Sequence, residues 1–206
     1  MITALTGGLA GCTASQPRSQ RPKGIIASLP PGPPSPAADQ PVWLGTAPQA
    51  VLTGANGERQ AGILLSSRWF SPSGNVQTTA PDGSPVRWPA AVAAPAPADI
   101  DVRIPTHSHP ARVDVRLFHG ELDGNGVPTS NPRTLACRNE LSSQAATASG
   151  CRLGNDQEGL LVHLAEHRFP VIVLYAEWYV PVADRPPGAQ DNAVVSASWG
   201  FRIVVR

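Results

Sequence analysis

Two histidines in the middle of the chain have the residue type and spacing of a metal site. His107 and His109 flank Ser108, so on an extended backbone both imidazoles point to one side and can share a copper or zinc ion. His119 is the expected third ligand if the two flanking strands form a hairpin. The alternative is an exposed turn over 105–110, bracketed by prolines. The sequence favours the turn, because it assigns no third ligand by itself.

A second histidine pair belongs to the string His163-Leu-Ala-Glu-His167, which spells the H-x-x-E-H motif of inverted zinc metallopeptidases. That chemistry needs a helix, on which both histidines reach the metal and the glutamate acts as the base. Here residues 159–164 have the composition of a strand, and Phe169-Pro170 ends any helix within a turn. We therefore expect a strand end followed by a polar turn, and we interpret the motif as fortuitous.

The other catalytic patterns are incomplete. Asp123-Gly-Asn-Gly126 resembles the start of a calcium loop, but residues 127–132 lack the further oxygen ligands and the closing glutamate of an EF-hand. The sequence has no G-x-S-x-G and no Gly-rich phosphate loop, and Ser198 lies inside a strand pattern. We expect no enzyme and no cofactor, with a hydrolase as the least favoured alternative.

Aromatic residues offer a last type of site, since exposed rings can form a sugar-binding platform. The chain has five tryptophans, and Trp199 falls on the apolar side of a strand pattern, which predicts a core position. Trp69 and Phe70 come directly before the turn-like Ser71-Pro-Ser-Gly74. These two are the weak candidates for an exposed ligand-binding surface.

The elements that must position these residues are strands. From Val195 to Arg206 apolar residues alternate with small or charged ones, which predicts a strand with one buried face. Residues 171–180 are apolar at both parities, as in a strand that is covered on both faces. Three prolines interrupt the connection 181–188. We expect the two strands to pair and the rest of the domain to pack on them.

Turn signals divide the middle of the chain into shorter strands. A Gly-Ala-Asn-Gly turn between 50–53 and 60–66 predicts an early hairpin, and a Pro-Asp-Gly turn between 75–79 and 85–88 predicts a second. Gly120–Pro132 reads as a polar loop. Further strands are expected at 100–104, 112–117, 133–137 and 159–164.

About eight or nine short strands with few helical stretches predict an all-β fold, an antiparallel β-sandwich that resembles the immunoglobulin-like architecture. The cysteines do not follow the immunoglobulin Cys-Trp-Cys pattern, because Cys137 and Cys151 are too close in sequence to join two sheets in that way. They are expected to form a local structural disulfide instead. Closing a loop of about 15 residues would stabilise the domain by roughly 3 kcal/mol.

The N-terminal segment resembles a processing signal. Leu9-Ala-Gly-Cys12 lies just ahead of a polar linker and resembles a bacterial lipobox, the site at which a signal peptide is cleaved and the new N-terminal cysteine is lipidated. The resemblance implies a membrane anchor on Cys12. We divide the chain into a signal-peptide remnant over 1–12, a disordered Pro-rich tether over 13–41 and a β-sandwich domain over 42–206.

Charge and composition narrow the function classes. Sixteen basic and fifteen acidic residues leave a formal charge of +1 without a basic cluster, so we expect no nucleic-acid partner. The sequence therefore predicts a lipid-anchored or secreted envelope protein on the outer face of the cell membrane. It would act as a binding or structural module for an unidentified protein or envelope glycan. The alternative is a copper- or zinc-binding surface domain that uses His107 and His109.

Overall fold

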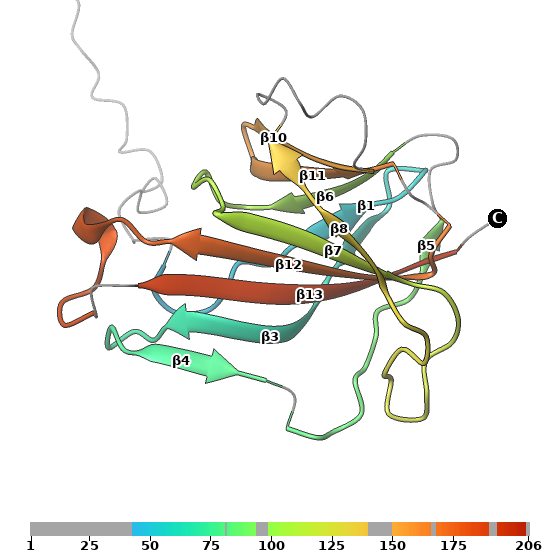
Figure 1. Cartoon of the computed structure of the whole chain (residues 1–206), viewed down its shortest axis with the longest axis horizontal. Helices are drawn as coiled ribbons and strands as arrows, with labels where there is room; N and C mark the ends of the chain where they lie inside the picture. The colour runs from blue at the N-terminus through green and yellow to red at the C-terminus, as the bar shows by residue number, and fades with distance from the viewer. Residues whose placement is uncertain are drawn as a thin grey trace, which may run out of the picture. The chain divides into compact units, whose positions relative to one another are not determined.

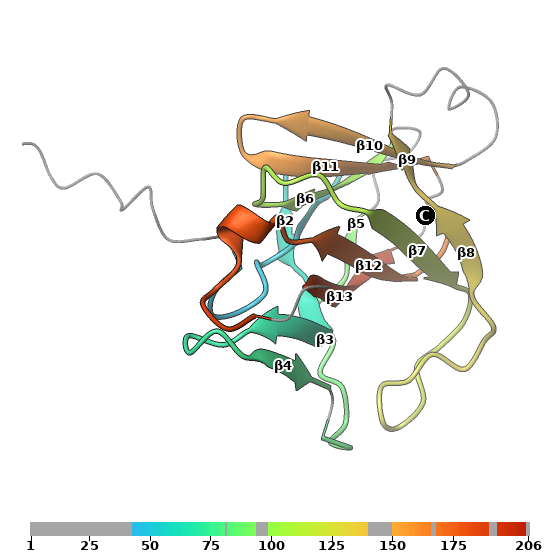
Figure 2. The ribbon, with the colours of Figure 1, turned by 60° about the vertical axis from the view of Figure 1, so that its left-hand side comes forward.

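The computed structural model describes residues 43–80, 82–93, 99–139, 150–165, 168–189 and 193–204. Two β-sheets pack against each other in this part of the chain (Figures 1 and 2). One 3-10 turn, η1 (Val182–Asp184), is the only described element that is not a strand. The prediction of an all-β antiparallel sandwich is confirmed. The predicted tether and the predicted lipobox lie outside the described residues.

The larger sheet has the strand order β4-β3-β13-β12-β7-β8, with β5 beside β13. Its strands are β3 (Ile63–Phe70), β4 (Val76–Thr79), β5 (Val92–Ala93), β7 (Arg112–Phe118), β8 (Arg133–Ala136), β12 (Val171–Tyr179) and β13 (Val194–Val204). The pairings are antiparallel except for the short β5–β13 contact. As predicted, the two terminal strands pair at the centre of this sheet, in register from Val171 opposite Arg202 to Tyr179 opposite Val194.

The smaller sheet has the order β2-β1-β6-β11-β10-β9. Its strands are β1 (Val51–Thr53), β2 (Arg59–Ala61), β6 (Ile100–Ile104), β9 (Arg138–Asn139), β10 (Cys151–Asp156) and β11 (Gly159–Leu164). In an immunoglobulin-like sandwich, strands A, B, E and D form one sheet, and G, F and C form the other. The runs β1-β6-β11-β10 and β13-β12-β7 follow these two orders, which supports the architectural resemblance.

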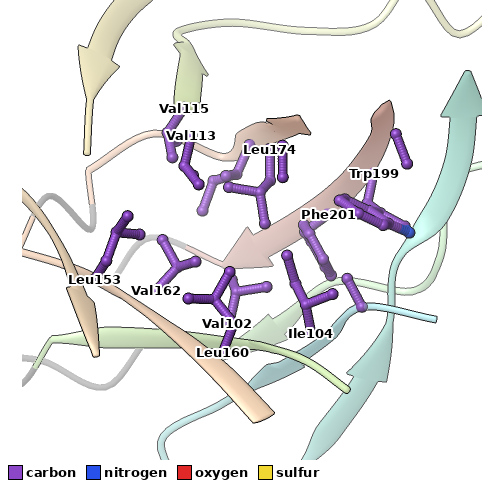
Figure 3. Packing of buried hydrophobic residues seen from close by; sticks show 14 of the residues in the cluster. Val102, Ile104, Val113, Val115, Leu153, Leu160, Val162, Leu174, Trp199 and Phe201 are labelled. Atoms are coloured by element: carbon purple, nitrogen blue, oxygen red, sulfur yellow. The ribbon is translucent and has the colours of Figure 1, made fainter. Parts of the chain in front are cut away.

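The core lies between the two sheets. Figure 3 shows Val102 and Val162 of the smaller sheet pointing toward Leu174 and Phe201 of the larger one. Every second residue of β13 from Val195 to Ile203 is buried, as its alternating pattern predicts. Trp199 is fully buried, and its Nε1 donates a hydrogen bond to Pro48 O at 3.0 Å. Its predicted core position is therefore confirmed.

Gly62 divides a segment that we predicted to be one strand. The early hairpin is present, because β1 and β2 pair in antiparallel register. The chain then leaves the smaller sheet at Gly62 and continues as β3 of the larger sheet. A Cβ atom on Gly62 would lie 2.6 Å from the ring of Phe201, so the crossing requires a residue without a side chain.

The second predicted hairpin is wrong. β4 pairs with β3 across the turn 71–75, and residues 85–88 form no strand. They run over the larger sheet instead, because two contacts hold the Trp88 side chain there. Its ring lies against Gly200, and its Nε1 donates a hydrogen bond to Gly126 O at 2.6 Å.

The Cys137–Cys151 disulfide is present, with a Cα–Cα distance of 4.7 Å. It joins the two sheets, contrary to the expectation from its short sequence separation. The reason is that the chain passes from β8 of the larger sheet to β9 of the smaller one at Cys137. The N–H of Cys137 still donates to Val113 O of the larger sheet, while Cys151 begins β10 of the smaller sheet.

Candidate functional site

Turns that are far apart in sequence gather at one end of the sandwich, at the left of Figure 1. We call the turns 105–111, 157–158 and 180–189 the loop end. Trp178 Nε1 donates to Ser108 O at 3.1 Å, which ties the first turn to β12, and a Cβ atom on Gly159 would lie 2.8 Å from Thr106 N. The turns 105–111 and 180–189 correspond to the B–C and F–G loops, which carry the binding surface of immunoglobulin variable domains.

His107 and His109 are both exposed at the loop end. The backbone between them is held in place, because Trp178 binds the carbonyl of Ser108 and the buried Thr106 accepts a hydrogen bond from Ser108 N at 3.3 Å. The prediction of an exposed turn is confirmed. Binding of copper or zinc by the two imidazoles stays a prediction.

His119 lies at the opposite end of the sandwich. β6 and β7 follow each other in sequence but belong to different sheets, so they form no hairpin. The seven residues of β7 carry His119 about 23 Å away from the loop end. There its ring packs against the ring of Phe169 at an interplanar angle of 33°, with ring centroids 3.9 Å apart. The hypothesis that His119 is a third ligand is wrong, and no group of three His, Cys, Asp or Glu among the described residues is arranged to hold a metal.

Trp69 and Phe70 do not form an exposed ligand surface. Phe70 is fully buried and Trp69 is 3% exposed. The ring of Trp69 packs 5.8 Å from that of Trp43 and 5.8 Å from that of Trp178, measured between centroids. The adjacent Ser-Pro-Ser-Gly turn suggested exposure, but the final residues of β3 extend into the core, where the indoles form one cluster.

The structure reveals a pair of ionisable residues that no sequence motif predicts. His163 lies on β11 directly opposite Asp101 of β6, and its Nδ1 is 2.7 Å from Asp101 Oδ1. No local pattern links two residues that are 62 positions apart. The expected strand at His163 is confirmed, whereas Glu166 and His167 lie outside the described residues.

Further ion pairs surround this histidine on the outer face of the smaller sheet. Arg103 binds the carboxylates of both Asp156 and Glu158, the latter at 2.8 Å. The hydrogen bond from Arg103 holds the pKa of Asp156 below its usual value, against the opposing effect of burial. Arg152 pairs with Asp99 at 2.9 Å. These contacts join β6, β10 and the following turn into one charged face.

The outer face of the larger sheet carries a second polar network. The hydroxyl of Tyr175 donates to Glu177 Oε2 at 2.7 Å. Burial, followed by this hydrogen bond, raises the pKa of the Tyr175 phenol. Asp114 is buried beside them and is paired with Arg112. Ser198 lies opposite Tyr175 and is half-buried on this face. Because both carboxylates are satisfied by neighbouring donors, the network stabilises the sheet face.

A hollow of about 300 Å³ lies beside β3. Its lining includes Ile63, Leu64 and Leu65 of β3 and the segment 84–87. This volume is at the lower limit of pockets that hold small molecules. Both Asp82 and Arg87 line the hollow, so its charged groups favour neither anions nor cations.

The Asp123–Gly126 segment is a turn, as predicted. Asp123 Oδ1 accepts hydrogen bonds from the backbone N–H groups of Asn125 and Val127, at 2.9 and 2.8 Å. The carboxylate therefore closes its own turn, which is a common role of aspartate.

Fold and site together define an antiparallel β-sandwich whose strand order resembles that of the immunoglobulin-like architecture and whose loop end carries two exposed histidines. Comparison of the chain with family models, with curated proteins and with solved structures finds no match. Among the described residues, no helix has the length and apolar character needed to span a membrane.

Proposed function

We propose that the chain is an exported envelope protein, lipid-anchored or secreted, that acts as a non-catalytic binding or structural module. The observation that carries this proposal is the Cys137–Cys151 disulfide. Disulfides persist in oxidising compartments such as the periplasm and the cell exterior, and they are rare in the cytosol. This bond links the two sheets, so the fold itself benefits from such an environment.

Lipidation of Cys12 would supply the membrane anchor. Leu9-Ala-Gly-Cys12 resembles a lipobox, and the Pro-rich residues 13–41 would hold the sandwich away from the bilayer as a semi-extended tether. More than one acyl chain is needed for stable rather than marginal anchoring, and a lipidated N-terminal cysteine carries more than one.

The binding role is supported by the loop end. In variable immunoglobulin domains, ligands contact loops that a rigid sandwich holds at one end. Here the turns 105–111 and 180–189 take these positions, and both are fixed to the core through β12. The partner would be a protein or an envelope glycan.

Lipidation can be tested in a bacterial host that processes lipoproteins. We expect the parent chain to incorporate labelled palmitate and to sediment with membranes. Cys12→Ala should abolish both, whereas the neighbouring Thr13→Ala should change neither. Membrane association of Cys12→Ala equal to that of the parent would contradict the anchor.

A copper or zinc surface site is the second candidate function. The specific observation in its favour is that His107 and His109 are both exposed on one turn whose backbone is fixed by Trp178. Zinc and copper titration of untagged chain should show binding that His107→Ala and His109→Ala each weaken. His119→Ala is the matched control, because His119 is exposed but lies at the other end of the sandwich. Equal weakening by His119→Ala would contradict this site.

A further inference from the structure

The edge of the larger sheet at β4 is open. Figures 1 and 2 both show β4 at the border of the sheet with no strand beyond it, and the strand order ends there. All four residues of β4, Val76-Gln-Thr-Thr79, are exposed. An exposed strand edge presents unpaired N–H and C=O groups to which another strand can add.

β4 lacks the charged residue found at the other three ends of the two strand orders in the described part of the chain. β2, β8 and β9 occupy those ends, and each contains an arginine: Arg59, Arg133 and Arg138. The two-residue strand β5 beside β13 is also uncharged, but its Ala93 O already accepts a hydrogen bond from Ala55 N at 3.0 Å. Charged residues on an edge strand protect it from pairing with another chain. β4 has no charge and no proline, and three of its residues are β-branched, which favours strand pairing.

The hydrogen-bond pattern shows which groups of β4 face outward. Ser71 N donates to Asn75 O at 2.7 Å, which makes this the closing hydrogen-bonded pair of the β3–β4 hairpin. In an antiparallel ladder, hydrogen-bonded and non-hydrogen-bonded pairs alternate. The backbone groups of Gln77 and Thr79 therefore face β3, and those of Val76 and Thr78 face away from the sheet.

We propose that β4 pairs with β4 of a second copy of this chain, antiparallel across a two-fold axis at Gln77. In this register Val76 lies opposite Thr78 of the other copy, and the outward N–H and C=O groups of these two residues exchange hydrogen bonds. Val76 and Thr78 are on the same face of the strand, so direct pairing preserves the pleat. The interface is isologous and joins two larger sheets into one. It does not depend on export or on lipidation.

Like charges at the edge test the proposal. We expect sedimentation equilibrium of the full chain to show a concentration-dependent dimer. Val76→Lys with Thr78→Lys should abolish it, and so should Val76→Glu with Thr78→Glu, because each places like charges opposite each other. Mixing the two variants should restore a dimer that contains one chain of each. Thr134→Lys on the edge strand β8 is the control and should leave the parent dimer unchanged.

A cysteine pair tests the register. Non-hydrogen-bonded antiparallel neighbours have Cα atoms about 4.5 Å apart, which a disulfide can span. In the full chain with Cys12→Ala, Gln77→Cys should form an intermolecular disulfide on mild oxidation. Thr79→Cys should form much less, because the axis at Gln77 keeps the two Thr79 positions about 13 Å apart.

Three results would overturn the proposal. The first is a parent chain that stays monomeric at all concentrations tested. A monomer that binds an extended peptide of another protein at β4, but not a second copy of itself, counts as this result. The second is a dimer that survives both charge variants while circular dichroism shows them folded. The third is equal cross-linking of Gln77→Cys and Thr79→Cys.

Discussion

The ring of Trp88 lies against the backbone of Gly200, which belongs to the central strand β13 of the larger sheet. A Cβ atom on Gly200 would be 2.6 Å from Trp88 Cζ3. Trp88 cannot move aside freely, because its Nε1 is bonded to Gly126 O. We expect Gly200→Ala to lower the free energy of unfolding by about 1–3 kcal/mol, as is usual for overpacking. Urea unfolding should show a lower midpoint at an unchanged slope.

Gly124→Ala is the matched control for that substitution. No atom lies within 4 Å of a Cβ added at Gly124, and the residue is in an exposed loop. Its effect on the free energy of unfolding should stay within about 0.5 kcal/mol. Equal losses from Gly124→Ala and Gly200→Ala would contradict the role of the Trp88 contact.

The predictable parts of this fold are those with a local pattern. The alternation from Val195 to Arg206 predicts both the strand and its buried face, because the period of a strand is two residues. The crossing at Gly62 has no such signal, since apolar residues continue on both sides of it. The ring of Phe201, which is far away in sequence, leaves no room for a Cβ atom at the crossing residue Gly62. Likewise, the turn between β6 and β7 carries no signal that the two strands belong to different sheets.

The same distinction applies to the candidate site. Prolines on both sides of His107 and His109 predict an exposed turn, and the structure has one. The predicted exposure of Trp69 is wrong, because the turn after this residue does not indicate whether the end of the preceding strand lies in the core or at the surface. The Asp101–His163 pair depends on the register of two strands, which a single sequence does not encode in any local pattern.

The disulfide is expected to contribute about 3 kcal/mol to the free energy of unfolding, because it closes a loop with a sequence separation of 14 residues. Urea unfolding of the Cys12→Ala chain, with and without reductant, measures this difference. The unfolded, unreduced chain should contain no free thiol and the reduced chain two. Two free thiols before reduction would contradict the bond. Cys12→Ala alone should leave the stability unchanged.

The Arg103–Asp156 pair predicts a pH dependence. The pKa of Asp156 is lowered in the folded chain, chiefly by the hydrogen bond from Arg103, relative to about 3.9 in the unfolded chain. Its contribution is therefore present above about pH 3.9 and is lost as the pH falls through the folded-state pKa. Because the Asp156 side chain is 32% exposed, the contribution should be at most about 1 kcal/mol.

Asp156→Asn tests this dependence with little change in shape, since the amide oxygen can still accept the hydrogen bond from Glu158 N. The free energies of unfolding of the parent and the variant should differ at pH 7 and converge in acid. Combining Asp156→Asn with Arg103→Gln in a double-mutant cycle isolates the pair. A difference that stays constant from neutral to acid pH would show that the carboxylate charge is not involved.

Three tryptophans of the core cluster should respond differently to the same change to phenylalanine. Trp178 Nε1 donates to Ser108 O at 3.1 Å and Trp199 Nε1 to Pro48 O at 3.0 Å, whereas Trp69 Nε1 is buried without a hydrogen-bond partner. All three substitutions remove buried ring area. Trp178→Phe and Trp199→Phe also leave a carbonyl without its indole donor, whereas Trp69→Phe removes an unsatisfied donor. This difference should change the loss in the free energy of unfolding by about 1–3 kcal/mol. We therefore expect Trp69→Phe to lower the free energy of unfolding by the smallest amount in urea titrations. Losses at Trp69 equal to those at both other positions would show that its indole N–H is satisfied in solution.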